Sequence, residues 1–114
     1  METEQQIQQA IRLELGQGDV RLWRNNTGRL LDRNGRPVTF GLCPGSSDLI
    51  GLRRVRVTPE MVGRWLAVFA AIEVKGPKGR LTREQQQFLE VVTGLGGLGG
   101  EARSIEDARG VLRL

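Results

Sequence analysis

The feature that most constrains the fold is a change along the chain in the spacing at which hydrophobic residues recur. Apolar residues recur at helical spacing near the start and again over residues 81–92, whereas the segments between them read as strands. Glycine-containing turns separate these segments. The resulting order is a helix, three or four strands, a helix, a strand and a helix. This order predicts an α/β fold built in layers.

Caps and turns set the limits of the expected elements. Thr3 with Gln6 forms a capping box for the first helix, and Thr82 caps a later one. Asn34-Gly35 is a strong hairpin signal. The predicted elements after the first helix are strand 20–26, hairpin 31–40, strands 48–57 and 65–74, helix 81–92, strand 102–103 and helix 105–112.

Composition excludes several classes of protein. A chain of 114 residues suits one domain, so residues 1–114 are expected to form a single domain. The sequence has no histidine and one cysteine, which excludes Cys/His zinc sites, histidine-based triads and an internal disulfide. No apolar segment approaches the ~20 residues that span a bilayer, and the acidic, glutamine-rich start is not typical of a signal peptide. We therefore expect a cytoplasmic protein with no membrane partner.

The charged residues are biased towards arginine. The chain has 17 Lys and Arg against 13 Asp and Glu, and the only lysines are Lys75 and Lys78. Arginine binds phosphate through two parallel hydrogen bonds, so this bias favours a nucleic-acid partner. A GC-rich genome would give the same bias, and charge alone does not decide between the two.

Residues 94–99 read Gly-Leu-Gly-Gly-Leu-Gly and match the GxGxxG pattern of dinucleotide-binding sites. That pattern requires a strand before it and a helix after it. Here it follows a predicted helix and precedes a predicted strand. It therefore predicts a helix stop and a tight return loop, and no organic cofactor is expected.

The residues that could bind a metal or take part in catalysis lie on two predicted strands. Side chains alternate along a strand, so Glu73 and Lys75 project together while Ile72 and Val74 point into the core. Ionised groups on an apolar strand are costly unless they are paired, solvated or bound to an ion. Asp48 opens another strand directly after a Gly-Ser-Ser turn, which lets it reach the same point.

Asp48, Glu73 and a backbone carbonyl such as that of Val74 would form an oxygen-rich site suited to Mg²⁺ or Mn²⁺. Such a metal would bind a phosphate oxygen and activate a water, with Lys75 beside it as a point charge. The alternative is an edge-strand Glu–Lys pair and an unrelated turn aspartate, since isolated Glu-x-Lys triplets are common by chance.

Five segments of the chain, taken together, resemble the VRR-NUC (virus-type replication-repair nuclease) domain, a branch of the PD-(D/E)XK nuclease superfamily. They are residues 24–28 (RNNTG), 45–51 (GSSDLIG), 71–75 (AIEVK), 79–85 (GRLTREQ) and 102–104 (ARS). The resemblance covers nearly the whole chain, from about Glu4 to Leu112. It implies a restriction-endonuclease-like core, with a mixed central β-sheet flanked by helices and the N-terminal helix first. It also implies a metal-dependent DNA endonuclease that leaves 5′-phosphate products.

The resemblance assigns catalytic roles at matching positions. The metal-binding aspartate, the Glu-x-Lys pair and the glutamine of the next helix would be Asp48, Glu73, Lys75 and Gln85. An acidic residue on the first helix usually completes such a site; Glu4 is our choice, and Glu14 on the same helical face is its rival. The superfamily has a proline before this aspartate. The VRR-NUC branch has Gly-Ser-Ser-Asp instead, and here Ser47 stands at the proline position.

Polar and basic residues near these motifs are candidates for DNA contacts. They are Arg24, Asn25, Asn26, Ser46, Ser47, Arg54, Arg56, Arg80 and Arg103. Asn25 and Asn26 either contact DNA or the catalytic loop, or form a polar turn. Arg54 and Arg56 share a face of predicted strand 48–57, which suggests a DNA-facing ridge; neutralising both should then flatten the salt dependence of DNA binding.

The expected function is cleavage of branched DNA, such as Holliday junctions, in replication, repair or recombination. Because two strands must be cut, a two-fold homodimer is the natural hypothesis. The family suggests a viral or prophage origin. Two alternatives remain: a non-catalytic DNA-binding module, and a less structure-selective nuclease, such as an RNase or a restriction-type enzyme, on the same fold. The presence of Asp48, Glu73 and Lys75 favours an enzyme.

Overall fold

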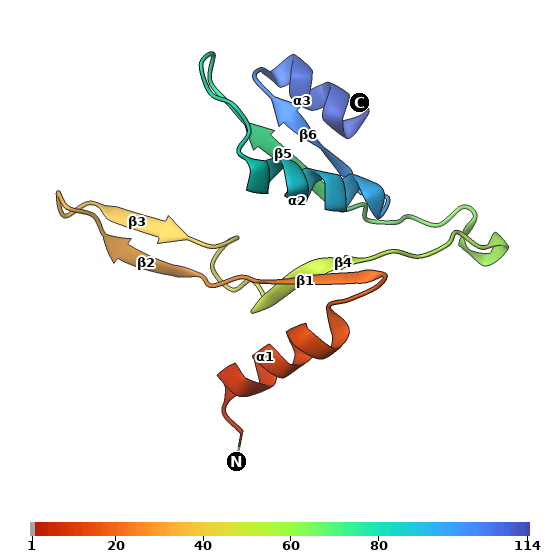
Figure 1. The fold of residues 1–114 in the computed structure, drawn as a ribbon, viewed down its shortest axis with the longest axis horizontal. Coiled ribbons are helices and arrows are strands. Elements are labelled where there is room, and N and C mark those ends of the chain that lie inside the picture. The colour runs from red at the N-terminus through yellow and green to blue at the C-terminus, as the bar shows by residue number, and fades with distance from the viewer. Residues whose placement is uncertain (1) are drawn as a thin grey trace. The chain divides into compact units, whose positions relative to one another are not determined.

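The computed structural model describes residues 2–114 and divides the chain into two compact units, Met1–Arg53 and Arg54–Leu114 (Figure 1). Each unit is a small assembly of helices and strands and is described by itself. The prediction of a mixed α/β protein is confirmed by three α-helices and three short ladders of strands in the described chain. Within residues 2–114, no helix is both long enough and apolar enough to cross a membrane.

The first unit contains one helix and four strands. They are α1 (Glu4–Leu15), β1 (Val20–Arg24), β2 (Gly28–Leu31), β3 (Pro37–Phe40) and β4 (Leu49–Arg53). The predicted capping box of α1 is confirmed: Gln6 N donates to Thr3 Oγ1 at 3.1 Å, and Thr3 N donates to Gln6 Oε1 at 2.9 Å. These two bonds satisfy amide groups that a helix start otherwise leaves unpaired.

Strands β1 and β4 pair antiparallel, and this ladder leads directly to Asp48. Asn25 N donates to Asp48 O at 2.8 Å, which adds one more bond beyond the last paired residues of the two strands. Gly51 lies opposite Leu22, and a Cβ added at Gly51 would lie 1.8 Å from the carbonyl oxygen of Arg21. The close approach of β1 to β4 therefore requires glycine at position 51.

Strands β2 and β3 form the predicted hairpin, with its turn at the expected place. The amides of Asn34 and Arg36 both donate to Asp32 Oδ1 at 2.8 Å, and Gly35 has φ 76°. Phe40 covers its partner Gly28 so closely that a Cβ there would lie 2.3 Å from the ring. An aromatic ring over a glycine in this way compensates for the side chain that the strand lacks.

The second unit is a parallel β–α–β arrangement followed by a helix. It contains a short 3-10 helix η1 (Pro59–Met61), β5 (Ala70–Val74), α2 (Arg83–Gly94), β6 (Leu98–Ala102) and α3 (Ile105–Leu112). Strands β5 and β6 pair in parallel, as expected for strands joined by a crossover helix (Figure 1).

Helices α2 and α3 cover opposite faces of the β5–β6 ladder. A Cβ added at Gly99 would contact Leu89 of α2, whereas one added at Gly100 would contact Val111 of α3. Neighbouring residues of a strand point to opposite faces, so the two helices lie on different sides of β6. Leu89, Val92 and Ala102 are the buried apolar residues, and Val92 is fully enclosed. The core of this unit therefore lies between α2, β6 and α3.

Several predicted element boundaries were wrong. Predicted strand 20–26 stops at Arg24, predicted strand 48–57 is Leu49–Arg53, and predicted strand 65–74 begins only at Ala70. The helix expected at 81–92 is Arg83–Gly94. The strand expected at 102–103 is β6, which takes in the last two residues of the glycine motif that was expected to be a loop. Its glycines lack side chains, so α2 and α3 can approach the strand closely, and packing overrides the low strand propensity of glycine. The strands described here pair in twos, and a continuous central sheet stays a prediction.

Candidate active site

The end of β5 carries Glu73 and Lys75, the two charged residues that were predicted to project from one face of the strand. Lys75 Nζ lies 3.6 Å from Glu73 Oε1, and both side chains project from the same face of the strand. The Lys75 side chain is 17% exposed and that of Glu73 is 34% exposed, so neither charge is fully solvated. The structure thus brings together the two charged residues of the Glu-x-Lys element in a partly buried position.

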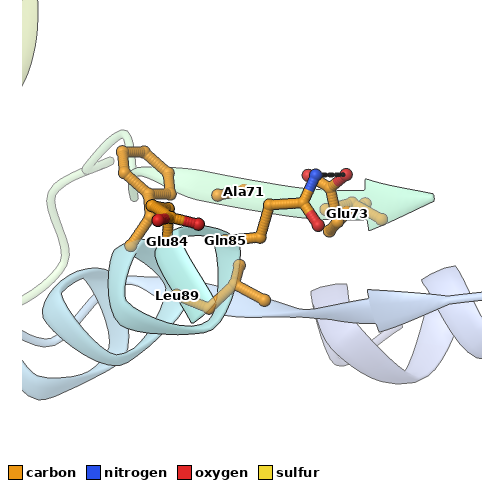
Figure 2. A pocket seen from close by; sticks show the side chains of 7 residues that line it. Ala71, Glu73, Glu84, Gln85 and Leu89 are labelled. Carbon is orange, nitrogen blue, oxygen red and sulfur yellow. Dashed lines mark hydrogen bonds between the residues drawn. The ribbon is translucent and has the colours of Figure 1, made fainter. Parts of the chain in front are cut away.

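Gln85 of α2 connects this ion pair to the start of the helix (Figure 2). Its Nε2 donates to Glu73 Oε1 at 2.9 Å, while its Oε1 accepts from Thr82 N at 2.9 Å. Thr82 Oγ1 in turn accepts from Gln85 N at 3.1 Å, which completes the capping box. Both ends of the Gln85 amide are therefore occupied, and the helix cap fixes the group that holds Glu73.

A pocket of about 350 Å³ opens beside Glu73, between β5 and α2 (Figure 2). Its polar lining comes from Glu73, Glu84 and Gln85, and the rest of its wall is apolar. The remaining lining residues are Ala71, Ile72, Phe88 and Leu89. Glu73 therefore lies at the wall of a hollow and not on a flat strand surface.

The carbonyl of Val74 points to the edge of β5 that faces away from β6. Leu98 N donates to Phe69 O at 2.9 Å and Lys75 N donates to Ala102 O at 3.1 Å, so the odd-numbered residues of this strand bond to β6. In a parallel ladder the residues between them direct their amide and carbonyl groups to the other edge. The Val74 carbonyl is therefore not used by the β5–β6 ladder.

A second charged pair lies beside the first one, and sequence reasoning missed it. Glu101 is the cross-strand partner of Glu73, so the two carboxylates share a face of the ladder. The Arg103 guanidinium forms an ion pair with Glu101 and donates to the carbonyls of Gly76 and, at 2.6 Å, Gly79. Arg103 was a candidate for a DNA contact; within this unit its side chain binds protein groups. Only the register of β6 shows that Glu101 neighbours Glu73.

In the first unit, Asn25 holds the loop that leads to Asp48. Asn25 Nδ2 donates to Ser46 Oγ at 2.6 Å and to Ser47 O at 2.9 Å, and Asn25 Oδ1 accepts from Leu42 N at 2.9 Å. Ser46 Oγ also donates to Cys43 O at 2.6 Å. The side chains of Asn25 and Ser46 thus form an internal network around this loop, and Asp48, itself exposed, follows the network directly.

Replacing Asn25 by Ala should therefore destabilise the loop before Asp48. The change removes three hydrogen bonds of a half-buried amide, and we expect a loss of about 1–3 kcal/mol in the free energy of unfolding. Asn26→Ala is the matched control, because Asn26 is exposed and accepts only a long 3.4 Å bond from Arg24 Nη2. Urea unfolding of both variants measures the difference, and equal stability of the two would contradict the assigned network.

The other predicted site residues are exposed. Glu4 lies in the first turn of α1 and Glu14 near its end. Arg54 and Arg56 lie beyond the end of β4, so the argument that strand alternation places them on one face was wrong. Arg80 is an exposed residue shortly before α2, and Ser47 an exposed residue next to Asp48. Within the described residues of either unit, no three Asp, Glu or Cys side chains gather closely enough to hold a metal ion.

The double role of Gln85 gives a prediction that separates its two bonds. Gln85→Glu keeps an acceptor for Thr82 N, because glutamate also serves at this capping position, but removes the donor to Glu73. We expect an intact helix by circular dichroism and a lower free energy of unfolding, since two neighbouring carboxylates repel each other. Gln87→Glu, an exposed change on the same helix, should show no such loss.

Comparison with known proteins identifies the family. No curated protein and no solved structure matches the chain with statistical significance. The family model described as the VRR-NUC domain matches residues 2–105 and so covers nearly the whole sequence. This chain, in which Glu73 and Gln85 line one pocket and Lys75 pairs with Glu73, therefore belongs to the VRR-NUC family of nuclease domains.

Proposed function

We propose that this protein is a divalent-metal-dependent DNA endonuclease in which Asp48, Glu73 and the Val74 carbonyl bind Mg²⁺ or Mn²⁺. The observation that carries the proposal is the arrangement of Glu73, held by Gln85 Nε2 at 2.9 Å with Lys75 Nζ at 3.6 Å. This is the neighbourhood that a metal-binding carboxylate and an assisting ammonium group require, and it occurs in a chain of a nuclease family.

The donor atoms suit a hard cation. Within the second unit, both contacts described for the Glu73 carboxylate fall on Oε1, which leaves Oε2 for a ligand bond. The Val74 carbonyl is directed away from the β5–β6 ladder, and carboxylate and carbonyl oxygens are the ligands that Mg²⁺ and Mn²⁺ prefer. Asp48 would supply the second carboxylate. Glu4 is proposed as the acidic residue of the first helix, with Glu14 as the alternative.

In this proposal the residues of the chain orient the reactants of phosphodiester hydrolysis. A bound divalent cation supplies Lewis-acid polarisation of the phosphate and activation of water. Gln85 holds Glu73 in place, and Lys75 donates to a non-bridging oxygen of the scissile phosphate. The oxygen of water forms a bond to phosphorus, the P–O3′ bond breaks, and the 3′-oxygen leaves with a proton. The products are a 5′-phosphate and a 3′-hydroxyl.

We further propose branched DNA as the substrate and a two-fold homodimer as the active form. A four-way junction is resolved by two symmetric cuts, and one small catalytic unit supplies only one. The exposed arginines Arg24, Arg54, Arg56 and Arg80 are the proposed phosphate contacts, with Asn26 and Ser47 as further candidates. A strictly monomeric protein in sedimentation experiments at working concentrations would exclude the dimer but not the nuclease.

The test compares cleavage of labelled linear, flap and four-way DNA by the wild type, Asp48→Asn and Lys75→Ala, with Mg²⁺, with Mn²⁺ and with EDTA. We expect metal-dependent cleavage by the wild type and a loss of at least about 100-fold in both variants. Lys78→Ala is the control for Lys75→Ala, because Lys78 is an exposed lysine three residues away. Equal activity of all proteins would indicate a contaminating nuclease, and DNA binding without cleavage would favour a non-catalytic module.

A further inference from the structure

We propose that Arg103 is a positioning residue of this nuclease, which sets Lys75 by clamping the loop of residues 76–79 that follows β5. The inference rests on the proposed function, since it concerns the lysine assigned to catalysis. Arg103 itself lies after β6 and is separated from Lys75 by the whole of α2 and β6 in the sequence. Its effect on the site therefore depends on the contacts made by its side chain.

The Arg103 guanidinium is held by three groups from two segments. It donates to the carbonyl of Gly76 and, at 2.6 Å, to the carbonyl of Gly79, and it forms an ion pair with Glu101. The planar fork of arginine is suited to such divergent acceptors, whereas the single ammonium of lysine is not. The backbone of Arg103 is fixed as well, because its amide donates to Asp107 Oδ2 at 2.9 Å in the first turn of α3.

The clamped loop is the surface against which the Lys75 side chain packs. Gly79 N donates to Gly76 O at 3.2 Å, so the same carbonyl that Arg103 binds also closes the turn. A Cβ added at Gly79 would lie 3.3 Å from Cδ and 3.5 Å from Cβ of Lys75. The lysine stem thus lies against the bare backbone of Gly79, and a shift of the loop would move Nζ relative to Glu73 Oε1.

Arg103 also balances a charge beside the site. Glu101 and Glu73 are register partners on the same face of adjacent parallel strands, so their carboxylates are neighbours. Like charges in this position repel, and the ion pair with Arg103 compensates the charge of Glu101. Without Arg103, the charge of Glu101 would be uncompensated next to Glu73, the partner of Lys75. Both effects of Arg103 therefore act on the Glu73–Lys75 pair.

The decisive experiment measures steady-state cleavage by Arg103→Lys, with Arg109→Lys on α3 as the matched control. We expect kcat to fall about 10- to 100-fold without a change in KM, which is the size of effect that a misplaced catalytic group produces. A raised KM with unchanged kcat would show that Arg103 binds phosphate, and would overturn the proposal. An unchanged kcat in Arg103→Lys would also overturn the proposal.

A second arm tests the route through Lys75. In the Lys75→Ala background, measured with enzyme in excess over DNA, Arg103→Lys should not lower the cleavage rate any further. A full additional loss of rate would overturn the proposal that Arg103 acts through Lys75. A third arm needs no activity: amide hydrogen exchange at Gly79 should accelerate in Arg103→Lys but not in Arg109→Lys, and unchanged exchange would exclude the clamp. If the wild type cuts no DNA, the proposed function fails, while this exchange still decides the role of Arg103 in the loop.

Discussion

Glu73→Gln is expected to lower the rate of metal-dependent DNA cleavage by at least about 100-fold while DNA binding persists. The substitution keeps the size of the side chain but removes the negative charge that would bind the cation and that faces Lys75 Nζ at 3.6 Å. It also places an amide opposite the Gln85 amide, which donates to Glu73 at 2.9 Å. Rates measured under single-turnover conditions with saturating enzyme separate this loss from a change in affinity.

Glu84→Gln is the matched control for this prediction. Glu84 lines the same pocket from the first turn of α2, yet the proposed site does not use it (Figure 2). We expect its cleavage rate to equal that of the wild type. If both glutamate variants lost activity equally, the general negative charge of the pocket, rather than Glu73 as a ligand, would be responsible. If neither variant lost cleavage activity, Glu73 would not be part of the active site.

Gly51→Ala is expected to unfold the β1–β4 ladder, with a loss of about 3 kcal/mol or more in the free energy of unfolding. The added Cβ would lie 1.8 Å from the Arg21 carbonyl oxygen and 3.0 Å from the Leu22 Cα. Both are backbone atoms, so no side-chain rotation relieves the overlap and the two strands must separate. Because β4 begins directly after Asp48, the same change should abolish cleavage.

The fluorescence of Trp23 in β1 provides the measurement, in a Trp65→Phe background that leaves one reporter in the first unit. Gly110→Ala in α3 is the control, since a Cβ at that position meets nothing within 4 Å. It should not lower the free energy of unfolding that Trp23 reports, because alanine is the better helix former. A Gly51→Ala protein as stable as the wild type would contradict the β1–β4 register.

Local signals predicted most of the elements because they act over a few residues. The capping box at Thr3, the Thr82 cap and the hairpin turn at Asn34-Gly35 are formed by groups at most three or four positions apart. The pair of Glu73 and Lys75 follows in the same way from the alternation of one strand. These features could be predicted because their partners are neighbours in the sequence.

Strand limits and long-range partners could not be predicted in this way. The glycine-rich start of β6 has poor strand propensity and becomes a strand because β5 pairs with it while α2 and α3 close over its bare faces. From the sequence, Arg103 was a candidate DNA contact, because nothing local shows that the carbonyls of Gly76 and Gly79 come within its reach. The Arg103 contacts and the β5–β6 pairing join residues more than 20 positions apart, and the contacts of α2 and α3 with β6 join residues about 10 positions apart.

The sequence by itself determined which reactive side chains the chain carries and which caps and turns limit its elements. It also determined the motifs of the nuclease family to which the chain belongs. Only the tertiary structure decided that Gln85 holds Glu73, that Glu101 lies beside Glu73, and that Arg103 and Asn25 serve the protein's own loops. The physical reason is the sequence distance over which each interaction acts. Helix and strand propensity and side-chain alternation depend on neighbouring residues. Strand register and helix packing depend on residues far apart in the sequence, and they determine which groups each side chain contacts.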